Sequence, residues 1–266
     1  MTRAPSTDAL LVERREAVAY LTMNRPRVLN VLDETLAAAM ATAFASVADD
    51  PSVRAVVLAG AGRSFMAGGD LALFHADLAA APATAAELID RFHAVMRSIR
   101  RMPKPVIAAI HGPVAGGGVG LALACDLVIA ADDTTLRSAY TKLGTSPDGG
   151  TTWSLTRLLG PRRAVELMLL NEPIDAADAL RLGLVNRVVT KADLMPAATA
   201  LAERLTRTAA GADAAVKRLV QQAVEGSFDR QLDLEKDSFV GLAGTADFRE
   251  GISAFIEKRG ARFKTG

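Results

Sequence analysis

Residues 105–126 constrain the fold of this chain more than any other segment, because they join an apolar run to a glycine cluster and a second apolar run. Residues 106–110 predict a buried strand, and the residues after the glycines predict an apolar helix. Gly116, Gly117 and Gly118 allow the main chain to approach a ligand closely, since they carry no Cβ. The first turn of a helix presents N–H groups that have no helical partner. The segment therefore predicts a site where main-chain donors meet negative charge.

The sequence of this loop excludes several functions that glycine loops commonly have. Neither the dinucleotide pattern G-x-G-x-x-G nor the P-loop pattern G-x-x-x-x-G-K-[ST] follows any predicted strand. The G-x-S-x-G pattern of a nucleophile elbow is absent as well. What remains is a pocket for the oxyanion that develops on an uncharged substrate carbonyl. The alternative is a tight turn that only packs a helix against a sheet.

Composition limits the classes of partner. The 31 basic and 30 acidic residues give a net charge of +1, so no broad field favours nucleic acid or an anionic membrane, and we expect neither as a partner. No apolar run is long enough to span a bilayer, and the N-terminal residues lack the core of a signal peptide, so we expect a cytoplasmic protein.

Cysteine and histidine are too few to support metal chemistry. The single cysteine, Cys125, excludes an internal disulfide and reads as a buried, inert thiol. The three histidines do not stand at metal-ligand spacing with it, so we expect no metal.

Predicted strands and helices alternate through the first half of the chain. We expect a hairpin over residues 10–23, a helix capped by Asp33 that runs to residue 50, a strand at 53–59, a helix at 85–101 and a strand at 127–130. From Gly150 the chain looks mainly helical, interrupted at 185–189. This order predicts an α/β fold, with a core at residues 1–190 and a helical region at residues 191–266.

Five separated segments, residues 21–30, 63–71, 103–126, 143–150 and 247–259, resemble the enoyl-CoA hydratase/isomerase family, also called the crotonase superfamily. The resemblance implies a spiral of ββα repeats with a helical C-terminal region used in trimerisation. It also implies an acyl-CoA thioester as substrate, no cofactor beyond the CoA moiety, and a homotrimer or a hexamer made of two trimers.

The resemblance indicates which residues donate to the oxyanion, and it also shows that this chain lacks the two catalytic glutamates of the hydratases. The backbone N–H groups of Gly69 and Gly117 correspond to the pair that holds the thioester oxygen. Hydratases of the family use two glutamates, but their positions hold Gly120 and Tyr140 here. Glycine cannot ionise, and a phenol with a pKa near ~10 is a poor base at neutral pH. The standard hydratase mechanism therefore does not carry over.

The same resemblance indicates where CoA binds. Arg25, in the first segment, is a candidate contact of the CoA adenine and phosphates, and Ala67, in the second segment, is a further candidate CoA contact. Phe255 and Lys258 are candidates on a C-terminal helix that closes over the nucleotide of a neighbouring subunit. Phe255 also lies on an apolar helical face with Ile252 and Ile256, so it could equally be a core residue.

Asp148 stands where related isomerases, including phenylacetyl-CoA types, carry an aspartate, and it could move a proton between the ends of a dienolate. By its spelling alone, Ser-Pro-Asp-Gly-Gly also suits an aspartate that caps the following helix. Tyr140 and His93 would shape the pocket or orient Asp148, although His93 could be a core histidine.

Four functions remain open at this point. The first is isomerisation of an enoyl-CoA double bond, and the second is hydratase-family chemistry with a different base. The third is hydrolysis similar to that of 4-chlorobenzoyl-CoA dehalogenase, with Asp148 as nucleophile and His93 as the group that activates water. The fourth is a non-catalytic trimer that binds acyl-CoA.

Overall fold

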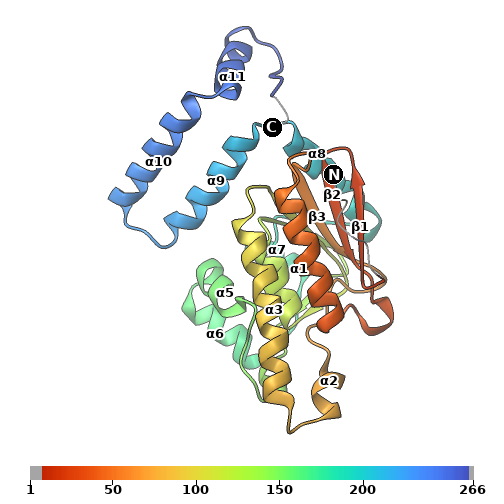
Figure 1. The fold of residues 1–266 in the computed structure, drawn as a ribbon. Helices are drawn as coiled ribbons and strands as arrows, with labels where there is room; N and C mark the ends of the chain where they lie inside the picture. Colours follow the sequence, from red (N-terminus) through yellow and green to blue (C-terminus); the bar gives the residue numbers. More distant parts are fainter. Residues whose placement is uncertain (1–7, 264–266) are drawn as a thin grey trace.

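The computed structural model describes residues 8–263 and arranges them as a two-layered α/β body with a helical extension (Figure 1). The large sheet has the strand order β1 (Leu10–Arg15), β2 (Val18–Met23), β3 (Ala55–Gly60), β4 (Val106–Ile110), β6 (Leu127–Ala131) and β9 (Arg187–Val189). Only β1 and β2 pair antiparallel, as the hairpin prediction requires, and the other neighbours are parallel. The mixed α/β architecture is therefore confirmed.

A smaller sheet runs beside the large one and makes the spiral. It contains β5 (Pro113–Ala115), β7 (Thr135–Arg137) and β8 (Ile174–Asp175). Successive turns of the chain place one strand in each sheet: β4 is followed by β5, and β6 is followed by β7. Isolated parallel bridges, Leu32 with Gly69 and Met66 with Val114, continue this second layer through the earlier turns. The predicted glycine segment thus lies where the two layers meet.

Both faces of the central strands are buried. Alternate residues of β3 show the pattern, since Val56 and Leu58 pack in one apolar cluster and Val57 in the other. Helices α1 (Glu34–Asp49) and α3 (Ala81–Arg101) cover the first face, and α8 (Leu194–Thr206) covers the second. Asp33 caps α1 as predicted, because its side chain accepts from the N–H of Leu36 at 2.8 Å.

Five short helices surround the sheets: α2 (Leu71–Ala76), α4 (Gly117–Ala124), α5 (Thr151–Leu159), α6 (Pro161–Leu170) and α7 (Ala176–Arg181). Single 3-10 turns lie at η1 (Pro26–Val28), η2 (Thr141–Leu143) and η3 (Lys191–Asp193). The helix predicted at 85–101 begins earlier, at Ala81, and the predicted interruption at 185–189 contains the short strand β9.

The C-terminal residues form two structurally different parts. Helix α8 lies against the large sheet, where Leu194 and Leu201 join the second apolar cluster and Tyr20 of β2 donates to Thr199 at 3.2 Å. Helices α9 (Ala210–Ala223), α10 (Phe228–Ala243) and α11 (Ala246–Ile256) extend away from the body (Figure 1). We call α9 to α11 the arm. Among the described residues of the predicted region 191–266, these helices are the ones that stand apart from the sheet.

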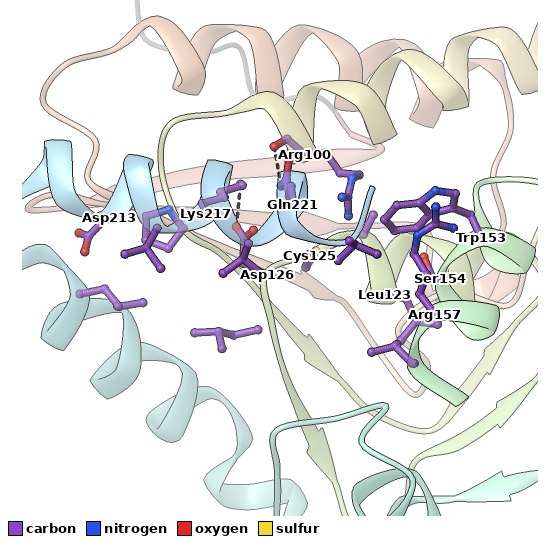
Figure 2. A pocket seen from close by; sticks show the side chains of 18 residues that line it. Arg100, Leu123, Cys125, Asp126, Trp153, Ser154, Arg157, Asp213, Lys217 and Gln221 are labelled. Carbon is purple, nitrogen blue, oxygen red and sulfur yellow. Dashed lines mark hydrogen bonds and ion pairs between the residues drawn. The ribbon is translucent and has the colours of Figure 1, made fainter. Parts of the chain in front are cut away.

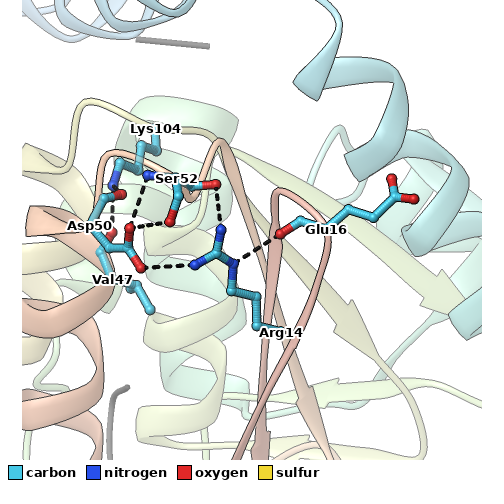
Figure 3. Close-up of polar contacts among 6 residues, drawn as sticks. All are labelled: Arg14, Glu16, Val47, Asp50, Ser52 and Lys104. Carbon is cyan, nitrogen blue, oxygen red and sulfur yellow. Dashed lines mark hydrogen bonds and ion pairs between the residues drawn. The ribbon is translucent and has the colours of Figure 1, made fainter. Parts of the chain in front are cut away.

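A polar cluster joins the N-terminal hairpin to α1 and to the segment before β4 (Figure 3). Arg14 of β1 pairs with Asp50 at 3.3 Å, and Lys104 donates to the carbonyl oxygens of Val47 and Asp50, each at 2.6 Å. The hydroxyl and N–H of Ser52 hold the pKa of Asp50 below its usual value. Three chain segments are therefore tied together at the end of α1.

Candidate functional site

The two predicted oxyanion donors are brought side by side by a pair of glycines with positive φ. Gly68 (φ 100°) and Gly116 (φ 53°) pack so closely that a Cβ on Gly116 would lie 3.5 Å from the Cα of Gly68. Gly69 and Gly117, the next residues, are therefore neighbours. Gly117 begins α4, where the backbone N–H has no partner within the helix. In the bridge to Gly69, Leu32 bonds to Gly68 O and Asp70 N, which leaves the Gly69 N–H outside that ladder.

The glycine loop also packs a helix closely against the sheet layers, which was the alternative to an oxyanion site in the sequence analysis. A Cβ on Gly118 would lie 2.1 Å from the carbonyl oxygen of Met66, so no side chain fits there. Gly118 thus allows α4 to rest against the second layer, while Gly117 faces the ring of Phe92. The packing role thus belongs to Gly118, whereas the predicted oxyanion donor is Gly117.

Asp148 is held by its side chain and not used as a helix cap. The phenol of Tyr140 donates a hydrogen bond to Asp148 Oδ1. Helix α5 has Gly150 as its N-cap residue and no side-chain cap, and it is the backbone carbonyl of Asp148 that accepts from the N–H of Thr151, at 3.0 Å. The capping interpretation of Asp148 is therefore wrong, because the carboxylate faces the phenol.

His93 supports the loop that carries Asp148. It lies on α3 and is half-buried, whereas its neighbour Phe92 is in the core. The N–H of Gly149 donates to His93 Nε2 at 3.3 Å, which makes this nitrogen an acceptor. The sequence prediction that His93 lies beside Asp148 thus has a structural basis in the backbone of the next residue.

Phe92 joins the two loops. A Cβ on Gly117 would lie 3.3 Å from the Phe92 ring, and a Cβ on Gly149 would lie 2.6 Å from it. The ring is 1% exposed, so it is fixed by the core. One side chain therefore sets the separation between the predicted donor at Gly117 and the loop of Asp148.

The position of the first hydratase glutamate has no room for a side chain. A Cβ on Gly120 would lie 2.6 Å from the carbonyl oxygen of Gly149 and 2.9 Å from Thr151 Oγ1. Contacts this short with backbone require that one element moves. The loop of Asp148 therefore occupies the space that a glutamate at residue 120 would need.

Tyr140, at the position of the second hydratase glutamate, is kept neutral. Burial is the main cause that raises the pKa of Tyr140, and the neighbouring Asp148 carboxylate raises it further. The phenol is 8% exposed. Tyr140 thus acts as a hydrogen-bond donor and not as a base.

The candidate CoA contacts fall into two separated groups. Arg25 pairs with Asp33 at 2.9 Å and with Asp70 at 3.3 Å, next to Gly69, and Ala67 donates its N–H to the carbonyl of Leu29 at 3.1 Å. Both residues thus lie in the turns next to Gly68 and Gly69.

Phe255 and Lys258 lie far from that group within one chain. Phe255 is 84% exposed on α11, and Lys258 follows at the end of that helix with φ 54°. Helix α11 lies at the opposite end of the molecule from α2, which begins one residue after Asp70 (Figure 1). The single chain does not bring the two groups together, and it does not bury Phe255 in a core.

A cavity of about 540 Å³ lies elsewhere, between α9, α5 and the end of α4 (Figure 2). Arg100 and Arg157 stack on Trp153, with guanidinium carbons 4.3 and 3.9 Å from the ring centroid. Lys217 of α9 pairs with Asp126 at 2.7 Å across this space. The predicted catalytic residues do not line it, and the hollow instead separates the arm from the body.

The cavity also contains the single cysteine. Burial raises the pKa of the Cys125 thiol far above its usual value, and its Sγ donates to the carbonyl of Leu121. A thiol that stays protonated is a poor nucleophile. The prediction of a buried, inert Cys125 is confirmed.

Among residues 8–263, no three His, Cys, Asp or Glu side chains lie close enough together to hold a metal ion. Within the same residues, no helix has both the length and the apolar character that crossing a bilayer requires.

Sequence reasoning missed the role of two residues at this site. The motif register located Asp148 and Tyr140, but the contact of Phe92 with both loops depends on three segments that are distant in sequence. Thr151 was missed as well, although it begins α5 and is fully buried beside Gly120. Its place directly after the Asp148 loop was the only sequence signal.

Comparison with known proteins places the chain in a family. Residues 13–266 match the family model described as enoyl-CoA hydratase/isomerase. The chain is 38% identical to the 1,2-epoxyphenylacetyl-CoA isomerase of Escherichia coli K12, over 96% of this chain and 97% of that protein. It is 37% identical to a probable enoyl-CoA hydratase of Mycobacterium bovis, over 96% and 98% of the two chains.

The fold is shared with solved structures. A crystal structure of an enoyl-CoA hydratase from Polaromonas sp. JS666 superposes with a TM-score of 0.93 at 37% identity, covering 96% of this chain and 99% of that one. A putative enoyl-CoA hydratase from Streptomyces coelicolor A3(2) superposes with a TM-score of 0.93 at 32% identity, covering 100% and 98%. The predicted crotonase-like fold with its helical C-terminal region is confirmed, and the chain is an enzyme of the enoyl-CoA hydratase/isomerase family.

Proposed function

We propose that this enzyme moves the double bond of an enoyl-CoA thioester, with Asp148 as the group that carries the proton. The observation behind the proposal is the hydrogen bond from Tyr140 to Asp148 Oδ1, which leaves Oδ2 available. The loop that carries Asp148 packs against Phe92, and so does Gly117. In this arrangement the N–H groups of Gly69 and Gly117 form the oxyanion hole for the thioester oxygen.

The reaction needs one base and no water. Asp148 Oδ2 removes a proton from the α-carbon of a 3-enoyl thioester, and the electrons form a dienolate whose oxygen accepts from Gly69 and Gly117. The protonated carboxyl then returns the proton to the γ-carbon, which gives the 2-enoyl thioester. Substrate and product have equal mass, and the carboxylate is regenerated.

Hydration by the two-glutamate route is disfavoured at both positions. Gly120 supplies no carboxylate, and the Asp148 loop fills the space beside it. Tyr140 is held as a neutral donor. The E. coli relative is named an isomerase, while other relatives are named hydratases, so names alone do not separate the two reactions.

A dehalogenase-like hydrolysis is the second candidate, because His93 contacts the residue next to Asp148. In that route, Asp148 forms a covalent aryl adduct and His93 activates the water that releases it. The geometry favours it less, since His93 Nε2 already accepts from the N–H of Gly149.

The deciding experiment uses purified protein with 3-enoyl-CoA and 2-enoyl-CoA in separate reactions, followed by mass-resolved chromatography. We expect the 3-enoyl substrate to isomerise without a change in mass. The variant Asp148→Asn should lose about 10²- to 10⁴-fold in turnover, because the proton carrier is gone.

Other outcomes would replace the proposal. A product heavier by one water would indicate hydratase chemistry through a different base. A covalent adduct on Asp148 with a haloaryl-CoA would indicate the dehalogenase route, and tight binding without any turnover would indicate a non-catalytic acyl-CoA-binding protein. Full isomerase activity in Asp148→Asn would reject Asp148 as the carrier.

We further propose that the arm associates with other subunits in a homotrimer or a hexamer. This would place Phe255 and Lys258 of one subunit near the CoA nucleotide of the next, and Arg25 and Ala67 near the same CoA within its own subunit. The support is the 84% exposure of Phe255 on a helix that projects from the body. CoA as a part of the substrate, and no separate cofactor, remains the prediction.

A further inference from the structure

A buried hydroxyl stands next to the Tyr140–Asp148 pair. Thr151, the first residue of α5, is fully buried, and its Oγ1 has no hydrogen-bond partner of good geometry among the described residues. A buried hydroxyl without a hydrogen-bond partner destabilises the folded state. Such a group at a proposed active site calls for a function.

The group that Thr151 faces is the phenol of Tyr140. Burial and the Asp148 carboxylate raise the pKa of Tyr140 and the Thr151 hydroxyl lowers it, so this hydroxyl is near the phenol. The backbone N–H of Thr151 also bonds to the carbonyl of Asp148 at 3.0 Å. Thr151 is therefore tied to Asp148 through its backbone, while its hydroxyl is left without a partner beside Tyr140.

Gly120 makes room for this hydroxyl. A Cβ at residue 120 would lie 2.9 Å from Thr151 Oγ1. The glycine that removes the hydratase carboxylate thus also allows a hydroxyl to stand behind Tyr140.

We propose that Thr151 is a positioning residue, whose hydroxyl donates to the phenol oxygen of Tyr140 and thereby keeps the single phenol proton directed at Asp148 Oδ1. This inference rests on the proposed function. A phenol has one proton and can accept at its oxygen, so a donor on the oxygen commits the proton to the other side. In the chain Thr151–Tyr140–Asp148, each bond polarises the next, and Asp148 Oδ2 stays free for the substrate.

The activity test compares Thr151→Val, which keeps the shape and loses the hydroxyl, with Thr151→Ser, which keeps the hydroxyl. We expect Thr151→Val to lower kcat for 3-enoyl-CoA isomerisation by about tenfold at an unchanged KM. Thr151→Ser should recover most of kcat. The exposed neighbour gives the control, Thr152→Val, which should resemble the parent.

Tyr140→Phe tests whether Thr151 acts through the phenol. Adding Thr151→Val to Tyr140→Phe should cost nothing further, since the link is already broken. Equal turnover in Thr151→Val and the parent, or losses that add in the double variant, would overturn the inference while leaving the isomerase proposal intact.

A measurement without turnover separates the two proposals. The chain has 2 tyrosines, so protein labelled with ¹³C at the tyrosine ring carbon that bears the hydroxyl gives two signals, and Tyr20→Phe assigns them. The Tyr140 signal should shift in Thr151→Val and return in Thr151→Ser. An unmoved signal in Thr151→Val would reject the contact, whether or not the protein isomerises enoyl-CoA.

Discussion

The imidazole of His111 shows how one buried residue couples stability to pH. It is 7% exposed, and its Nε2 lies 3.0 Å from the carbonyl of Gly62. Burial is the main cause that lowers the pKa of His111 below its usual 6.5, and nearby Lys191 acts in the same direction. The folded protein therefore holds this ring neutral, while the unfolded chain protonates it near pH 6.5.

We expect His111 to make the protein acid-sensitive. Between pH 6.5 and the lower pKa of the folded state, the unfolded chain binds more protons, so stability falls as pH falls. His111→Gln should remove up to about 1 kcal/mol of the difference in unfolding free energy between pH 7.5 and 5.5. Urea unfolding at fixed protein concentration measures it. His75→Gln, at an exposed position, is the control. An unchanged difference in His111→Gln would contradict the assignment.

At the scale of elements, the turn between η2 and α5 decides where Asp148 stands. Gly149 (φ 55°) and Gly150 (φ 73°) both adopt the left-handed conformation. They differ in their surroundings, because a Cβ on Gly149 meets Phe92 at 2.6 Å and one on Gly150 meets nothing within 4 Å. An alanine at Gly150 therefore introduces backbone strain alone, whereas an alanine at Gly149 introduces the same strain and also displaces Phe92 or the loop.

Gly150→Ala should cost about 1 kcal/mol from strain alone. Gly149→Ala should cost about 1–3 kcal/mol more, because Phe92 or the loop must move, and it should lower isomerase kcat well below that of Gly150→Ala. Thermal unfolding and steady-state kinetics of both variants measure this. Equal kcat in the two variants would mean that Phe92 does not position Asp148.

The sequence predicted the long elements and missed the short ones for a physical reason. The apolar run at β4 and the helical spacing of apolar residues in α1 extend over enough residues to be recognised in the sequence. Strands β5, β7 and β8 have three residues or fewer and are defined by their pairing across the two layers. No local pattern specifies such pairing.

The site was partly predictable on the same grounds. Asp148 and Gly117 stand in recognisable motifs, so the sequence located them. The collision between Gly120 and the Asp148 loop, and the place of Thr151, depend on how α4 packs against α5. The exposure of Phe255 could not be read from its apolar neighbours, because a face that packs on another subunit has the same pattern as a core face.

At the scale of the whole molecule, the arm carries apolar side chains that the single chain leaves exposed. They are Val216 and Val220 on α9, Val224 directly after α9, Phe239 and Val240 on α10, and Phe255 and Ile256 on α11. Exposed apolar surface of this extent is typical of subunit interfaces. The α9 members also rim the cavity between arm and body (Figure 2).

Val220→Asp should therefore dissociate the assembly. Light scattering after size-exclusion chromatography should give a multiple of 27.9 kDa for the parent and a lower mass for the variant, because a buried carboxylate without a partner is costly. Leu11→Asp, on exposed β1, should keep the parent mass. A parent that elutes as a monomer would reject the proposed trimer or hexamer.

Helix α8 has a consequence for the order in which the protein is made. The sheet face that includes Val57, Ile107 and Ile129 is covered by α8, which begins at Leu194. On the ribosome, that face remains open after β6 has been translated and until residues 194–206 emerge. Open apolar strands in a nascent chain are targets for aggregation. During this interval of translation the growing chain therefore exposes an apolar sheet face that chaperones can protect.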